Sequence, residues 1–167
     1  MSLSEGVEWS LHCAWLLTHV RPGEALSSRR MAEFYGLPSA YLPKLLKSLV
    51  RAGILDATTG PRGGFRLARP AGDITVLDIM EAVEGRGPLF QCTEIRQRGP
   101  APVSKADCRR PCGIAKVMHD AERAWRAQLA ATTVADLANQ ASSGSDSRAR
   151  RWLESLPERK GFELTGG

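Results

Sequence analysis

Three of the four cysteines lie between residues 92 and 112, where their spacing suits a metal or an iron–sulfur cluster. Cys92, Cys108 and Cys112 follow the pattern C-x15-C-x3-C, and thiolates are good ligands for iron–sulfur clusters and zinc. Three cysteines are one ligand short of a four-ligand site. Glu8 and His12, four residues apart in a predicted helix, project from one helical face and supply a carboxylate and an imidazole. The residues therefore predict a mixed site in which this pair joins two cysteines, with the metal left open.

A second group of residues suits contacts with a polyanion. The stretch from Arg21 to Arg69 contains nine lysines and arginines against three carboxylates, so it carries a charge of +6 while the whole chain carries +5. A local excess of positive charge of this kind is typical of a surface that binds nucleic acid. The alternative is an ordinary solvated face.

The elements that must position these basic residues follow the order of a winged helix-turn-helix. Apolar residues recur at helical spacing in three segments, a tight turn at 36–38 separates the second from the third, and a glycine-rich turn at 59–64 joins two short strands. We predict a mainly α fold with a small β-hairpin, built from helices at 4–20, 28–35 and 39–52 and strands at 54–58 and 65–68.

In this motif the third helix enters the major groove, with its amino-terminal residues against base edges. Ser39, Tyr41 and Lys44 lie in that part, whereas Lys47 and Arg51 are better placed for phosphates. Glycines at the wing tip allow a close backbone approach to DNA, where Arg62 reaches a minor groove or a phosphate. The predicted DNA contacts are Ser28, Ser39, Tyr41, Lys44, Lys47, Arg62 and Arg66.

The carboxy-terminal half is predicted to contain a dimerisation helix. After a helix at 76–83 capped by Thr75, a loop without periodicity runs to Cys112. A long helix over 113–131 then spaces Ile114, Met118, Ala121 and Trp125 as in a heptad seam, which favours a two-fold homodimer on a palindromic site; the alternative is packing within its own domain. The predicted units are a DNA-binding domain at 1–84, a cysteine loop at 85–112, a dimerisation helix and a short helix at 113–139, and a disordered tail at 140–167. Within the tail, a fragmentary helix at 148–156 is the alternative.

Composition narrows the class of protein further. The amino terminus has no basic stretch followed by an apolar run, and no segment approaches the ~20 apolar residues of a membrane span. We therefore expect a cytoplasmic protein without a membrane partner, whose cysteines are thiols or ligands and not disulfides. Cys13 lies among apolar residues and is expected to be inert, and His19 and His119 to be packing or surface residues. No nucleotide-binding glycine loop or nucleophile arrangement indicates an enzyme.

Both groups of residues together resemble the IscR/NsrR-type regulators, dimeric winged-helix proteins in which an iron–sulfur cluster controls DNA binding. SAYLPKLLKSLVRAGIL and GPRGGFRLARP look like the family's recognition helix and wing, and DITVLDIMEAVEG like the helix before its cysteine loop. Through GVEWSLHC, CTEIRQRGP and AERAWRAQLAATTVADL the chain is most similar to the redox-sensing RsrR-like branch of actinomycetes.

The resemblance implies a [2Fe–2S] cluster held by Cys108 and Cys112 of one subunit and by Glu8 and His12 of the other. Cys92 is then a spare or alternative ligand, because more familiar members place three cysteines closer together. That departure disfavours a [4Fe–4S] cluster. The alternatives are a winged-helix regulator with structural zinc or no metal, a non-specific basic DNA-binding protein, and, from another class, a small iron–sulfur electron-transfer protein.

Overall fold

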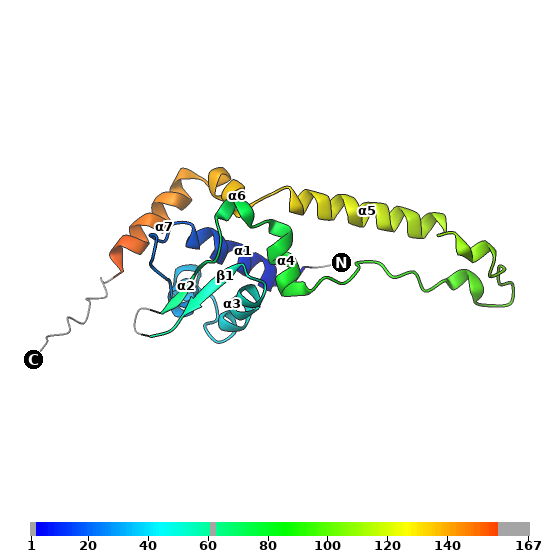
Figure 1. Cartoon of the computed structure of the whole chain (residues 1–167), viewed down its shortest axis with the longest axis horizontal. Helices are drawn as coiled ribbons and strands as arrows, with labels where there is room; N and C mark the ends of the chain where they lie inside the picture. Colours follow the sequence, from blue (N-terminus) through cyan, green and yellow to red (C-terminus); the bar gives the residue numbers. More distant parts are fainter. Residues whose placement is uncertain (1–2, 61–62, 157–167) are drawn as a thin grey trace, which may run out of the picture.

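The computed structural model describes residues 3–60 and 63–156. The body of the molecule contains the first four helices, a two-stranded hairpin and the last two helices, and an arm of residues 85–130 extends from it (Figure 1). In the arm a loop with two 3₁₀ turns runs outward and helix α5 runs back. The elements are α1 Glu5–Leu17, α2 Ser28–Tyr35, α3 Leu42–Arg51, β1 Leu55–Thr58, β2 Gly64–Leu67, η1 Ala71–Asp73, α4 Val76–Glu84, η2 Ile95–Gln97, η3 Asp107–Arg109, α5 Gly113–Ala130, α6 Val134–Gln140 and α7 Ser143–Ser155.

Helices α2 and α3 begin and end where local chemistry requires it. The Ser27 hydroxyl accepts a hydrogen bond from the Arg30 amide at 3.3 Å and caps α2, and Gly36 ends the helix with a φ of 66°. The third helix was predicted from residue 39 but begins at Leu42. Pro43 explains the difference: a proline is tolerated in the first turn of a helix, whereas further inside its missing amide removes a hydrogen bond.

The core of the body joins α1 to every other helix of the body. Cys13 and Leu16 of α1 lie in one buried cluster with Leu46 of α3 and Ile79 of α4. Val134, at the start of α6, is also fully buried in this cluster. The backbone amide of Val134 donates to Ile74 O at 2.9 Å, so α6, which follows the arm, completes the core of the body.

The hairpin forms the predicted wing. Strands β1 and β2 pair antiparallel, with Leu55 opposite Leu67 and Thr58 opposite Gly64. Leu26 exchanges backbone hydrogen bonds of 2.9 Å with Phe65 and so attaches the wing to the segment before α2. A Cβ atom at Gly64 would lie 2.6 Å from the Leu26 carbonyl carbon, and only glycine allows this approach.

Arg126 links the arm to the body at its base. Arg126 of α5 contacts Glu81 of α4 at 2.6 Å and Glu122 at 3.0 Å, and it donates to the Gly87 carbonyl at 2.9 Å. Glu122 in turn accepts from the Leu89 amide at 3.2 Å. This network holds the outgoing chain against the returning helix.

The prediction of a disordered tail from residue 140 is wrong for 143–155, which form α7. Ala149 is fully buried, and the Trp152 ring packs on Phe34 of α2 with 4.9 Å between ring centroids. The Arg148 guanidinium lies 4.4 Å from the Phe34 ring centroid and donates to the Phe34 carbonyl at 2.8 Å. Polar composition suggested disorder, but one apolar face of α7 is enough to hold it; residues 157–167 lie outside the described part of the chain.

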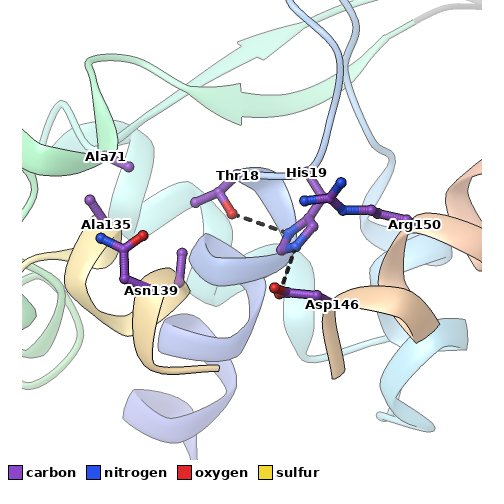
Figure 2. Close-up of a pocket in the computed structure, with 8 residues that line it drawn as sticks. Thr18, His19, Ala71, Ala135, Asn139, Asp146 and Arg150 are labelled. Atoms are coloured by element: carbon purple, nitrogen blue, oxygen red, sulfur yellow. Dashed lines mark hydrogen bonds and ion pairs between the residues drawn. The ribbon is translucent and has the colours of Figure 1, made fainter. Parts of the chain in front are cut away.

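A side-chain hydrogen bond links α7 to the residues that follow α1. His19, whose side chain is 8% exposed, contacts Asp146 through Nε2 at 3.1 Å, and its Nδ1 lies 3.1 Å from the Thr18 hydroxyl. Figure 2 shows these contacts at the edge of a cavity of about 520 Å³ between α1, α6 and α7, which Asn139 and Arg150 also line. His19 is a packing residue, as expected, and its partner lies 127 residues away.

Substitution of Trp152 by alanine is expected to lower the free energy of unfolding by about 2 kcal/mol, less than for a fully buried tryptophan because Trp152 is half-buried. The loss of the Phe34 contact is the physical cause. Urea denaturation followed by circular dichroism measures it, and Arg151→Ala, which removes an exposed side chain of the same helix, is the control. Equal midpoints for the wild type and Trp152→Ala would show that α7 adds nothing to the stability of the body.

Among the residues that the structure describes, none of the helices has the length and hydropathy needed to cross a lipid bilayer.

Candidate DNA interface and metal centre

Helix α3 presents one apolar and one polar face. Leu42, Leu45, Leu46 and Leu49 are buried, whereas Tyr41, Lys44, Lys47 and Arg51 are exposed on the other side. Exposed positions three or four residues apart follow one helical face, which suits a helix lying in a groove of DNA. Ser39 and Tyr41 lie in the turn before the helix and not in its first turn. Ser39, Tyr41, Lys44 and Lys47 remain predicted DNA contacts, and Arg51 stays a residue better placed for a phosphate.

The remaining predicted DNA contacts flank α3. Ser28, half-buried, is the first residue of α2, next to the capping Ser27. In the wing, Arg66 is exposed but makes an ion pair of 3.4 Å with Asp56 on the neighbouring strand. Arg66 must exchange this weak surface pair for a phosphate if it contacts DNA. Arg62 lies outside the described residues.

Helix α1 carries the carboxylate and the imidazole of the predicted site. Glu8 and His12 are both exposed, one turn apart. The carbonyl of His12 accepts a hydrogen bond from the Tyr35 hydroxyl at 2.8 Å, so α2 holds this turn of α1. Trp9, next to Glu8, packs edge-on against Tyr41 with ring centroids 6.0 Å apart. The helix with the two candidate ligands therefore touches the start of α3 directly.

The cysteines lie on the arm. Cys108 and Cys112 are half-buried, in η3 and at the start of α5, whereas Cys92 is exposed on the outgoing loop. The Cys112 sulfur accepts a hydrogen bond from the Ala115 amide at 3.4 Å and caps α5.

The four candidate ligands do not meet within one chain. The segment 95–112 lies at the far end of the arm, well away from α1 in the body (Figure 1). Across residues 3–60 and 63–156, no three His, Cys, Asp or Glu side chains gather closely enough to hold a metal ion. Two thiols and a carboxylate–imidazole pair fit an iron–sulfur cluster chemically, but only if a second copy of the chain brings α1 to the arm.

Two charged residues that the sequence did not single out lie beside the cysteines. Arg96 binds both carboxylate oxygens of Glu94, at 2.6 and 2.9 Å, and donates to the Arg110 carbonyl at 3.3 Å. The hydrogen bonds to Glu94 raise the pKa of Arg96, and negative charge on Cys108 and Cys112 raises it further. No periodicity or spacing marks these residues in the sequence.

Cys13 is expected to resist alkylation, because burial raises its pKa to about 12 and leaves almost no thiolate at neutral pH. Treatment of the metal-free folded protein with iodoacetamide at pH 7.5 should modify the exposed Cys92 and spare Cys13. Peptide mass spectrometry measures both sites in one sample, and the denatured protein is the control for labelling. Labelling of Cys13 as fast as Cys92 would contradict its placement in the core.

Comparison with known proteins places the arm, and the body as far as the end of α6, in one family. The model of the Rrf2 family, described as an iron-dependent transcriptional regulator, matches residues 3–140. The chain belongs to the Rrf2 family. Rrf2 membership makes it a DNA-binding transcription regulator and not an enzyme, and it confirms the resemblance to NsrR- and IscR-type proteins.

Individual Rrf2 relatives agree with this. The chain is 31% identical to the HTH-type transcriptional regulator YwgB of Bacillus subtilis, over 75% of this chain and 76% of the relative. It is 28% identical to the transcriptional repressor NsrR of Streptomyces coelicolor, over 82% and 88% of the two chains. The solved structure of CymR, the global cysteine regulator of B. subtilis, is similar with a TM-score of 0.66 and 22% identity, covering 85% of this chain and 99% of CymR. The predicted winged-helix fold is confirmed, and α7 lies beyond the stretch that the Rrf2 model matches.

Proposed function

We propose that this Rrf2 regulator binds a palindromic operator as a homodimer, and that a [2Fe–2S] cluster shared between the two subunits sets its affinity for DNA. The observation that carries the proposal is the arm. It takes Cys108 and Cys112 away from Glu8 and His12 of the same chain, so these ligands meet only in a dimer (Figure 1).

Helix α5 has the surface that such a dimer needs. Ile114, Val117 and Met118 are 73%, 65% and 42% exposed and lie on one face, continued by Ala121. On the opposite face Lys116 and Arg123 pair with Asp120 and suit solvent. Exposed apolar residues at these spacings are typical of a helix that packs against a copy of itself. A two-fold axis along α5 places two copies of α3 on the half-sites of a palindrome.

The chain offers a short connection from ligands to DNA contacts. A bound cluster supplies a change of charge on oxidation, reduction or loss. Glu8 and His12 hold their end of the site on α1, and Trp9 on that helix packs against Tyr41 at the start of α3. A shift of α1 then moves α3, the proposed DNA-recognition helix, in the body of the same subunit. A coupling of about 1–3 kcal/mol between the two sites changes operator affinity by about 5- to 150-fold.

Structural zinc at the same ligands is the second candidate, since cysteine and histidine are also good zinc ligands. The two are separated by colour: an iron–sulfur protein absorbs beyond about 400 nm and contains iron and sulfide, whereas zinc is silent.

Trans-complementation tests the proposal. One copy carries Glu8→Ala and His12→Ala, the other Cys108→Ser and Cys112→Ser, and the two are co-expressed with different tags and purified together without oxygen. In the mixed dimer one site retains all four ligands and the other retains none. We expect almost no cluster in either variant homodimer, and about half of the wild-type iron and visible absorbance in the mixed dimer.

A mixed dimer as empty as the two homodimers would contradict ligation across the subunits. If the purified wild type contains zinc and no iron, the iron–sulfur proposal is wrong and structural zinc takes its place. The wild type and the two variant homodimers, purified in parallel, control for loss of the cluster during purification.

A further inference from the structure

The arm holds one ion pair in a fixed geometry beside the cysteines. Arg96 and Glu94 form two parallel hydrogen bonds, Nε to Oε1 at 2.6 Å and Nη2 to Oε2 at 2.9 Å. Both side chains are about 70% buried, more than a typical surface pair. Bidentate pairs of this type fix orientation as well as distance.

The backbone of the pair is constrained as well. Glu94 has a φ of 50°, the one positive φ outside glycine among the residues that the structure describes. Residues with a Cβ adopt this conformation rarely, and it persists where neighbouring contacts hold it. Two such contacts are present: the Arg96 pair and the turn in which the Gln97 amide donates to the Glu94 carbonyl at 3.0 Å. The carboxylate is thereby held against Arg96 instead of turning to solvent.

The pair also reaches the cysteine loop through Arg96. Arg96 Nη2 donates to the carbonyl of Arg110, which lies between Cys108 and Cys112 in the chain. Hydrogen bonds from Arg96 hold the pKa of the Glu94 carboxyl below its usual range. The segments 93–98 and 107–112 are therefore joined through side chains, and a fixed positive and a fixed negative charge lie next to the thiols.

We propose that Glu94 and Arg96 are positioning residues for the cysteine end of the metal centre, which hold the loop in place and set the charge around its two thiolates. The inference rests on the proposed function. Arginine remains protonated at any physiological pH, so Arg96 favours the more negative redox state of a neighbouring centre. The Glu94 carboxylate has the opposite effect, and the two charges balance.

Opposite shifts follow when one charge is removed at a time. In the anaerobic cluster-loaded protein, Arg96→Gln should move the reduction potential to more negative values. Glu94→Gln should move it to more positive values, because it removes a negative charge and leaves Arg96 charged. The double variant should fall between them. Arg98→Gln is the control, because it removes the same charge two residues further along the chain. The Arg98 side chain is exposed and, among the described residues, donates only to the Thr93 carbonyl, so this variant should leave the reduction potential unchanged.

The positioning role has a readout that needs no cluster. In the metal-free protein, Arg96→Gln and Glu94→Gln should both speed hydrogen exchange of the amides in 107–115, while Arg98→Gln should not. The proposed effect of the two charges on the reduction potential would be overturned by either of two results. In the first, Arg96→Gln and Glu94→Gln shift the potential in the same direction; in the second, they shift it no more than Arg98→Gln does. Unchanged exchange in the metal-free protein would overturn the positioning part. If the wild-type protein purifies without iron, the proposed function is contradicted. The hydrogen-exchange experiment on the metal-free protein then still tests whether Glu94 and Arg96 position the loop.

Discussion

Charge reversal at Lys44 and Lys47 is expected to weaken operator binding by at least about 100-fold at physiological salt. Both side chains are exposed on one face of α3, and a dimer brings two copies of each to the DNA. Each lysine brought against the DNA displaces counterions from the phosphates. With two lysines in each of two subunits, the double variant loses about four such charges from the interface and adds repulsion. The slope of log affinity against log salt should fall by about 3–4 in magnitude.

The measurement is fluorescence anisotropy with an operator selected in vitro from random DNA, at several salt concentrations. Lys105→Glu changes the same charge on an exposed arm residue far from α3 and should keep nearly the full affinity. A loss of affinity in this control as large as that of the α3 variant would mean that overall charge, and not α3, governs binding. Circular dichroism verifies that the fold is retained, because neither lysine belongs to the core.

Placing aspartate at Ile114 and Met118 is expected to turn the proposed dimer into a monomer. These side chains are 73% and 42% exposed in the single chain, so their replacement leaves the body intact but buries two carboxylates per subunit in the proposed interface. Sedimentation velocity should show the mass of one chain, about 18 kDa. Operator affinity should fall by more than about 100-fold, because one winged helix reads only a half-site.

Ala127→Asp is the matched control, since Ala127 is exposed on the opposite face of α5, next to the charged residues. It should leave the protein dimeric with full affinity. A dimer that survives both changes at Ile114 and Met118 would place the interface elsewhere. The unfolding midpoint of the monomeric variant, compared at equal concentration, separates loss of dimer from loss of fold.

The winged helix could be predicted from the sequence because its signals are local. Pro43 and Gly53 bound α3, Thr75 caps α4, and the leucines of α3 recur at helical spacing. The wing follows from two short apolar stretches around glycines. Cys13 was correctly placed in the core for the same reason, since its neighbours in a helical pattern are apolar.

The contacts that escaped prediction join segments far apart in the sequence. α7 has a polar composition, and its hold on the body depends on Phe34 and His19, more than 110 residues earlier. The Glu94–Arg96 pair depends on a left-handed backbone that no spacing encodes. Whether Glu8 and His12 meet Cys108 and Cys112 depends on a second chain, and that part stays a prediction.

The attachment of α7 also bears on how the chain folds as it leaves the ribosome. The buried cluster of the body contains side chains from Trp9 to Leu156, and the partner of His19, Asp146, is made 127 residues later. At about 5–20 residues per second, synthesis of that interval takes about 6–25 s. During this time Phe34 lacks the cover of Trp152, and the core around α1 lacks Val134 until the arm has been made. The body that contains the winged helix is therefore completed late in translation, although most of its residues are made first.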